Sequence, residues 1–437
     1  MTTTNHNNNN DNDNSDYTFL STEQVLADLV GAISFLKRHF ATTKVVAVGG
    51  SYGGMLTAWL QRQHPDLITA AWSSSAPLLG FADTLTKTDV SSALSSQQAQ
   101  QASAIYHVIE QDYIDNGNDP TNDDFDGKSC VETIGNAFRY MLWNQTDEEL
   151  RQQLCLCDND HDNKNTMPGS NVRDRAIGWL QNQFGTIANF DYPYEVTFDK
   201  VSVPGHPTRT VCRHLKEAVT TKGLQGAELL LTSLQWFIND PNTTISTTTT
   251  RIVNQTKPKT TDNENHSTWC RRLEPSFYSY YLGFIPGPWT YQRCYDLIMA
   301  YHVDETSNMF LPCSIYQPNC WSEATFAQFC QEQFGVRPRP SQSRSQYFGT
   351  TGYVEHQKIV LTNGNLDPWS YGGIGYEEYH RQRSRKKHKK YLADNVIWIE
   401  GASHHLDLWW PHPEDPPSVV AARQKAFQMI SEWIQES

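Results

Sequence analysis

The sequence lacks any long apolar segment and any surplus of basic residues. No run approaches the roughly 20 consecutive apolar residues that a membrane-spanning helix needs. The chain has 35 Lys and Arg against 48 Asp and Glu, which gives a net charge of −13. Because a negatively charged protein repels polyphosphates and anionic lipids, we expect neither nucleic acid nor a membrane as a partner.

Cysteine spacings that bind metals are also absent. The 9 cysteines include no pair separated by two residues, so the spacing of a zinc ribbon is missing. We therefore expect neither a metal nor another cofactor. All cysteines lie between Cys130 and Cys330, and the same stretch holds the N-glycosylation sequons at Asn144, Asn242, Asn254 and Asn265. Clustered cysteines together with sequons favour an oxidising, secretory compartment with disulfide bonds.

The N-terminus has neither the basic start nor the apolar core of a signal peptide. Residues 1–16, MTTTNHNNNNDNDNSD, form an Asn-rich polar tract whose composition predicts disorder. This tract conflicts with a secretory route. We expect either that the protein is not exported or that the sequence lacks its true beginning.

Residues 17–80 carry the pattern of the first part of an α/β core. A helix is predicted from the capping-box sequence STEQ at 21–24 to about residue 39. The β-branched run at 44–48 and the apolar run at 68–73 predict strands that flank a second helix. Strand, helix and strand in this order imply a parallel sheet.

Residues 347–437 carry the second part of the same core. Apolar runs predict strands at 358–362 and 395–400, and apolar spacing predicts a closing helix at 418–434. Residues 81–346 hold every cysteine and have mostly helical spacing. The prediction is therefore an α/β core that is interrupted by a large, mainly helical cap insertion.

A glycine turn joins the first predicted strand to the second helix. Its sequence GGSYG, at residues 49–53, fits the G-x-S-x-G pattern of a nucleophile elbow, in which a strained turn projects a serine above the sheet edge. We predict Ser51 as the nucleophile and the backbone N–H of Tyr52 as an oxyanion donor. The alternative is a turn that contains serine by chance, and the flanking strand and helix argue against it.

An acid and a histidine follow the last two predicted strands. Asp367 lies in NGNLDPWS and His404 lies in GASHHLDL. Taken alone, Asp367 would be interpreted as a turn carboxylate, because NGNLDP is rich in turn formers. Taken alone, His404 would be interpreted as a surface histidine, because the chain has 15 histidines. Serine, acid and histidine in this order, each after a strand, form the triad arrangement of α/β-hydrolases. We predict that Ser51 attacks, His404 transfers the proton and Asp367 orients the imidazole.

The motifs GGSYGGMLTAWL, NGNLDPWS and GASHHLDL resemble those of the serine carboxypeptidase family that contains lysosomal Pro-X carboxypeptidase, dipeptidyl peptidase II and thymus-specific serine protease. FDYPY, WTYQRC, MFLPC and FGVRPRP agree with this family, and HPEDPPSVVAARQ is most similar to dipeptidyl peptidase II. The resemblance extends from about Tyr17 to Ile434. It implies an α/β-hydrolase fold with a helical cap and cleavage after proline near a peptide terminus.

The resemblance also implies roles for further residues. The proline-binding positions of the family fall on Met55 and Trp369, and a thioether and an aromatic face suit a proline ring. Plain packing is the alternative for both. Disulfides are implied in the cap, with Cys130 and Cys294 as the best single pair, although pairing does not follow from sequence.

The family further implies proline-containing peptides as substrates and a lysosomal, vacuolar or extracellular location. Pro-X carboxypeptidase and dipeptidyl peptidase activity stay open as alternatives, as does a homodimer. A lipase or esterase would share the fold, but the pocket residues and cap motifs argue against it.

The chain departs from the family pattern before the elbow. Family members carry a longer segment there, with a signal peptide, the first strands and a loop that donates a second oxyanion N–H. We therefore expect an N-terminally incomplete core. Loss of one oxyanion donor costs about 10²–10³ in rate. The alternative function is a truncated, catalytically impaired member that acts at most as a binding protein.

Other departures concern single sites. The dipeptidyl enzymes of the family bind the substrate's free amine with cap carboxylates, and the sequence does not identify an equivalent here; Glu274 is nearby in sequence, but nothing else in the sequence supports it. Ser403 is an extra residue before the histidine pair, which leaves His405 as an alternative base. The basic run at residues 381–390 could bind a polyanion, but a solvated loop is the favoured interpretation in an acidic protein.

Overall fold

The computed structural model describes residues 17, 19–41, 43–80, 96–117, 126–156, 171–198, 201–238, 288–339, 347, 358–376, 379 and 393–436. The predictions for residues 1–16, Asn242, Asn254, Asn265, Glu274 and residues 381–390 lie outside this part of the chain. Among the described helices, none combines the length and the hydropathy that a bilayer crossing requires.

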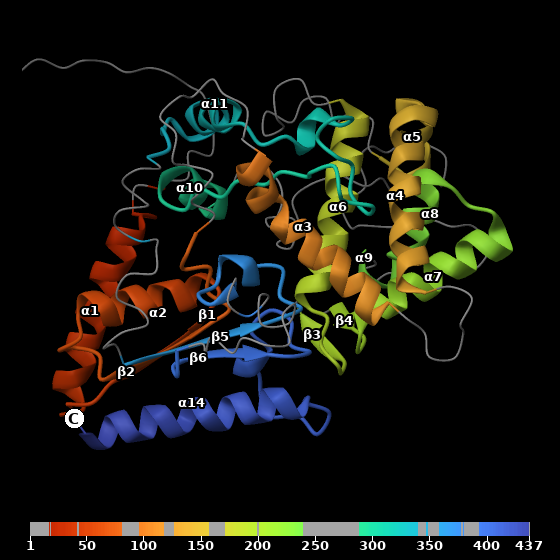
Figure 1. The fold of residues 1–437 in the computed structure, drawn as a ribbon. Coiled ribbons are helices and arrows are strands. Elements are labelled where there is room, and N and C mark those ends of the chain that lie inside the picture. The colour runs from red at the N-terminus through yellow and green to blue at the C-terminus, as the bar shows by residue number, and fades with distance from the viewer. Residues whose placement is uncertain are drawn as a thin grey trace, which may run out of the picture.

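A four-stranded parallel sheet forms the centre of the α/β core (Figure 1). Its order is β1–β2–β5–β6, with the bounds Val46–Gly50, Ala70–Ser74, Ile359–Gly364 and Val396–Ile399. All neighbouring strands are parallel, so their carboxyl ends lie at one edge. The predicted strands are confirmed, with boundaries that differ by one or two residues.

Helices cover both faces of this sheet (Figure 1). Helix α2 (Tyr52–Gln63) packs on β1 and β2, and α1 (Thr22–His39) packs on α2. Helix α14 (Pro417–Glu436) lies along the other face, where Ala426 and Ile430 are buried against the strands. Each helix has one apolar face because its apolar residues recur at helical spacing.

Between β2 and β5 the described chain is mainly helical, and we call residues 96–339 the helical insertion. Its helices are α3 (Ser96–Asn116), α4 (Gly127–Asn144), α5 (Asp147–Gln153), α6 (Val172–Asn189), α7 (Pro207–Lys222), α8 (Gly226–Ser233), α9 (Gln235–Ile238), α10 (Pro288–Tyr295) and α11 (Glu323–Phe334). The described part of the insertion also contains a hairpin of β3 (Val196–Phe198) and β4 (Val201–Val203) and the 3-10 helix η4 (Gln317–Asn319). The predicted α/β fold with a parallel sheet and helical insertion is confirmed.

The disulfides of the helical insertion differ from the predicted pair of Cys130 with Cys294. Cys130 on α4 bonds to Cys212 on α7, because these two helices pack together with the cysteine Cα atoms 5.4 Å apart. Cys294 on α10 instead bonds to Cys330 on α11. The predicted pairing was therefore wrong. Cys313 bonds to Cys320, and among the described cysteines Cys155 is free.

Candidate active site

Ser51 lies at the sharp turn between β1 and α2. Its backbone angles are φ 56° and ψ −127°, a region that costs a non-glycine residue about 1–3 kcal/mol. Ser51 N donates to Ser74 O at 2.9 Å, which ties the turn to β2. A Cβ added at Gly49 would lie 2.3 Å from Gly53 O, and one at Gly54 would lie 2.8 Å from Ser74 O. The turn therefore combines backbone strain with neighbours that must be small.

Helix α2 begins at Tyr52, directly after Ser51. The first N–H groups of a helix have no partner within it and carry partial positive charge, so they suit a developing anion. The Tyr52 hydroxyl lies 3.3 Å from Thr22 Oγ1 and 3.4 Å from Gln292 Nε2, and burial raises the pKa of Tyr52 to about 12. The side chain thus stays neutral and connects α1 to α10.

Asp367 lies in the tight turn that follows β5, and its side chain is fully buried. Its Oδ1 accepts a hydrogen bond from Trp369 N at 2.9 Å. The same oxygen lies 2.9 Å from His404 Nδ1. The short 3-10 helix η5 (Ser370–Gly372) follows Trp369 directly. A buried carboxylate is thereby held against one nitrogen of a histidine ring.

His404 lies on the loop after β6 and is 2% exposed. When the ring is neutral, Nδ1–H donates to Asp367, so Nε2 is the nitrogen that can accept a proton. His404 Nε2 is buried and has no hydrogen-bond partner among the described groups. It is therefore not bonded to Ser51 Oγ in this structure, as is common before substrate binds.

The neighbouring His405 has a different environment. Its backbone has φ 42°, and its N–H donates to Ser75 Oγ at 2.7 Å. Its ring lies against Gly50, where an added Cβ would be 3.2 Å from the ring Cγ. Burial lowers the pKa of His405 to about 3. The described hydrogen bonds thus join Asp367 to His404 rather than to His405, and the histidine loop contacts the turn that holds Ser51.

The histidine loop is attached to the sheet and to α14. Asp407, within the 3-10 helix η6 (Leu406–Leu408), accepts from Ser74 Oγ and from Thr362 Oγ1, both at 2.6 Å. Arg423 on α14 donates to the carbonyl oxygens of Leu406 at 3.0 Å and Asp407 at 2.9 Å. Burial raises the pKa of Asp407. These bonds hold the loop from three sides.

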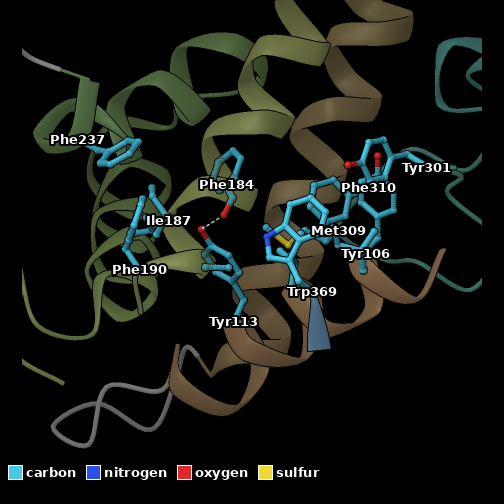
Figure 2. Close-up of a cluster of buried hydrophobic side chains, with 14 of the residues drawn as sticks. Tyr106, Tyr113, Phe184, Ile187, Phe190, Phe237, Tyr301, Met309, Phe310 and Trp369 are labelled. Atoms are coloured by element: carbon cyan, nitrogen blue, oxygen red, sulfur yellow. Dashed lines mark hydrogen bonds between the residues drawn. The ribbon is translucent and has the colours of Figure 1, made fainter. Parts of the chain in front are cut away.

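Trp369 extends from the acid loop into a buried cluster of apolar side chains (Figure 2). Its Nε1 donates to Asn189 Oδ1 at 2.9 Å. Its ring centroid lies 6.3 Å from that of Tyr301 and 6.4 Å from that of His404. Figure 2 shows Met309 of the insertion within the same cluster. The cluster thus continues from the histidine ring to an apolar surface of the insertion.

Met55 lies on α2, one turn after Ser51. Its N–H donates to Ser51 O at 3.0 Å, and its side chain is 1% exposed. Met55 and Trp369 belong to the same buried cluster. This cluster extends through the sheet core and the helical insertion, so Met55 adjoins Ser51 and Trp369 adjoins His404 within the same continuous apolar core.

Two residues that contact this site were not predicted from the sequence. Asn189 accepts from Trp369, and the Tyr192 hydroxyl donates to the backbone oxygen of His404 at 2.8 Å. Both lie at the end of α6 or just after it. For Tyr192 the available signal was the motif FDYPY at residues 190–194, whose polar groups within an aromatic stretch require partners once they are buried. Asn189 lies directly before this motif and had no comparable signal.

Comparison with known proteins covers the core and the insertion together. The model of the family Peptidase S28, serine carboxypeptidase S28, matches residues 6–426. Lysosomal Pro-X carboxypeptidase of Bos taurus is 27% identical over 423 residues, 96% of this chain and 69% of the relative. The Homo sapiens protein of that name is 26% identical over 424 residues, with the same shares. Thymus-specific serine protease of Homo sapiens is 24% identical over 448 residues, 95% of this chain and 69% of the relative. These matches confirm the resemblance that the motifs indicated.

Proposed function

The chain belongs to the serine carboxypeptidase S28 family and is a serine peptidase, and on this premise we propose that it hydrolyses the peptide bond that follows proline near a peptide terminus. The observation that carries the proposal is the buried hydrogen bond of 2.9 Å between Asp367 and His404, on a loop that contacts the strained turn of Ser51. Proline-containing peptides are the proposed substrates.

In the proposed mechanism, Ser51 Oγ attacks the carbonyl carbon of the proline residue while His404 Nε2 accepts the hydroxyl proton. Asp367 stabilises the imidazolium through Nδ1–H. The oxyanion accepts a hydrogen bond from the N–H of Tyr52. His404 then protonates the leaving amine, and it later activates the water that hydrolyses the acyl-enzyme.

We propose that Trp369 and Met55 bind the proline ring of the substrate. A proline ring offers no N–H and needs an apolar wall rather than an acceptor. Asn189 already accepts the Trp369 indole N–H, so the aromatic face can contact an apolar ring without leaving a buried donor unpaired. This arrangement supports a preference for proline before the cleaved bond.

We propose that the protein cleaves at the carboxyl end of its substrate, as a carboxypeptidase that releases the single residue after proline. The relatives that are 27% and 26% identical bear the name Pro-X carboxypeptidase. A blocked peptide that ends in Pro-X should be cleaved faster than an X-Pro-arylamide with a free amino end. The reverse order would assign the chain to the dipeptidyl peptidase type.

Labelling with a fluorophosphonate probe tests the nucleophile. The wild-type protein should be labelled, and Ser51→Ala should abolish labelling and peptidase activity. Ser233→Ala is the matched control, because Ser233 is a buried serine of α8 whose hydroxyl, among the described residues, bonds locally to Leu230 O at 2.7 Å. The assignment of Ser51 as the nucleophile would be refuted if the folded wild-type protein were not labelled, or if Ser51→Ala were still labelled.

We also propose that the protein follows the secretory route to a lysosomal or extracellular compartment. The disulfides described in the helical insertion require an oxidising environment. Asn144, within a sequon, is exposed at the end of α4 and is accessible for glycosylation. We expect the mass of the purified protein to decrease on treatment with an N-glycosidase. This decrease should be smaller in Asn144→Gln.

A further inference from the structure

The segment that leaves α6 contacts both loops that carry the proposed acid and base. Asn189 accepts from Trp369 Nε1 at 2.9 Å on the acid loop. Tyr192 donates to His404 O at 2.8 Å, and Tyr194 donates to Asp415 Oδ1 at 3.1 Å beyond the histidine loop. Two residues of the six-residue segment 189–194, Asn189 and Tyr192, therefore make hydrogen bonds from the helical insertion to the loops that carry the proposed acid and base.

Tyr192 is the central member of this segment. Its side chain is fully buried, and its hydroxyl also accepts from Trp409 Nε1 at 2.7 Å. Its ring packs edge-on against Trp409, with centroids 5.7 Å apart. Burial raises the pKa of Tyr192 well above its ordinary value. The hydroxyl therefore remains protonated and can donate to the His404 carbonyl throughout the pH range in which peptidases act.

The same segment is fixed to the insertion on its other side. The Asp191 carboxylate accepts from Thr208 N at 3.3 Å and from Thr208 Oγ1 at 3.0 Å, at the start of α7. The backbone oxygen of Tyr192 accepts from His206 N at 2.7 Å. Asp191 thus holds the segment to α7, and the next residue holds the histidine loop.

The carbonyl that Tyr192 contacts belongs to the peptide between His404 and His405. His405 has a left-handed backbone with φ 42°, so this peptide has a defined and unusual orientation. A rotation of the peptide would move the imidazole of His404 relative to Asp367. Displacements of about 1 Å at a reacting group can cost about 10²-fold in rate.

We propose that Tyr192 is a positioning residue for His404, through which the helical insertion holds the histidine loop in the orientation that pairs Nδ1 with Asp367. This proposal rests on the proposed function for its effect on catalysis. It does not make Tyr192 a catalytic residue, because the phenol contacts the histidine backbone and not the reacting atoms.

The test compares Tyr192→Phe with Tyr316→Phe. Tyr316 is a matched control, because it is 3% exposed and its hydroxyl also donates to a backbone oxygen, that of Asp174, at 3.2 Å within the insertion. Tyr192→Phe should lower kcat roughly 10- to 100-fold with KM nearly unchanged. Tyr316→Phe should leave both constants unchanged while it lowers the melting temperature by a similar amount. Equal kcat values for the two variants would refute the proposal.

A second readout does not depend on peptidase activity. The Nδ1–H proton of His404, shared with Asp367, should give a far-downfield proton resonance, assigned by its loss in Asp367→Ala. We expect this resonance to shift or broaden in Tyr192→Phe and to stay unchanged in Tyr316→Phe. An unchanged resonance in Tyr192→Phe would refute positioning even in an active enzyme. A shifted resonance in a protein that the fluorophosphonate does not label would support positioning and refute the proposed function.

Discussion

The sheet core and the helical insertion are stabilised in different ways. In the described core, the most deeply buried side chains include ionisable groups, and Asp367, His404 and Asp407 are 0%, 2% and 4% exposed. Strand β1 lies at the edge of the described sheet, and its Val48 is 56% exposed. In the insertion, Phe138 and Phe184 are fully buried, and disulfides join its helices.

This difference separates two tasks. The core holds the proposed acid and base, Asp367 and His404, at a set distance through hydrogen bonds, which are directional. The insertion supplies apolar surface and rigid support mainly through packing and covalent links, and it also buries carboxylates such as those of Asp112 and Asp191. Where they meet, Trp369 and Tyr192 each combine a buried ring with one satisfied polar group. The four predictions that follow test this division, from the largest expected effect to the smallest.

The largest effect should come from the acid of the core. Asp367→Asn would leave the loop packed but let the side chain bond to the wrong tautomer of His404. We expect kcat to fall about 10⁴-fold with little loss of thermal stability. Measurement of kcat and of the melting temperature checks this. A large loss of stability with retained kcat would show that the carboxylate serves the fold instead.

Truncation of an apolar side chain should lower the free energy of unfolding more in the helical insertion than at the edge strand of the core. Phe184→Ala in the insertion should lower the free energy of unfolding by about 3–5 kcal/mol, because it opens a cavity among fully buried residues. Val48→Ala at the sheet edge should change it by less than about 0.5 kcal/mol. Urea unfolding followed by circular dichroism gives both values. Similar losses would mean that β1 is covered in solution.

The disulfides should contribute according to the length of chain that they close. Cys130 and Cys212 are separated by 82 residues, whereas Cys313 and Cys320 are separated by 7. On the chain-entropy model, replacing the first pair by alanines should cost about 4.5 kcal/mol, against about 2 kcal/mol for the second. Calorimetry of the two double variants measures the difference. A larger loss for the short loop would contradict the entropic account.

The smallest effect concerns Asp112, which is fully buried in the insertion. Burial, followed by the charge of Asp191, raises the pKa of Asp112 well above its ordinary value of 3.8. The folded state thus holds a proton that the unfolded chain has lost. The stability that this proton provides is present below about pH 4 and is lost as pH rises through the folded pKa, by up to about 1.4 kcal/mol per pH unit.

Asp112→Asn removes this titration and should flatten the fall in the melting temperature between pH 4 and pH 8. Asp66→Asn, at an exposed position on the core, is the control and should follow the wild-type curve. Thermal unfolding at a series of pH values measures the slopes. Parallel curves for wild type and Asp112→Asn would show that Asp112 is ionised in the folded protein.

The strands and the loops that carry Ser51, Asp367 and His404 could be predicted because their signals are local. A β-branched run followed by GGSYGG describes a strand and a strained turn within a few residues. The positions of Asp367 and His404 could be predicted because each follows a strand closely. Since the carboxyl ends of neighbouring parallel strands meet at one edge of the sheet, the two side chains were expected to lie close together. The observed bond between His404 and Asp367 spans only 37 residues, and it forms where this reasoning placed it.

Contacts within the insertion could not be predicted in the same way. The pairing of Cys130 with Cys212 depends on which faces of α4 and α7 meet, and helical spacing alone does not determine that. The bond from Tyr192 to His404 spans 212 residues. Its phenol could as well have faced solvent, because one sequence contains no signal for a partner so far away along the chain.

The adjacency of β2 and β5 has a consequence for the order of folding. Trp72 Nε1 donates to Thr362 Oγ1 at 3.0 Å across 290 residues. At synthesis rates of about 5–20 residues per second, β2 leaves the ribosome roughly 15–60 s before its neighbour β5. During that interval the backbone N–H and C=O groups on one edge of β2 lack the strand that will pair with them. The nascent chain therefore passes through a period in which chaperone binding competes with aggregation at this edge.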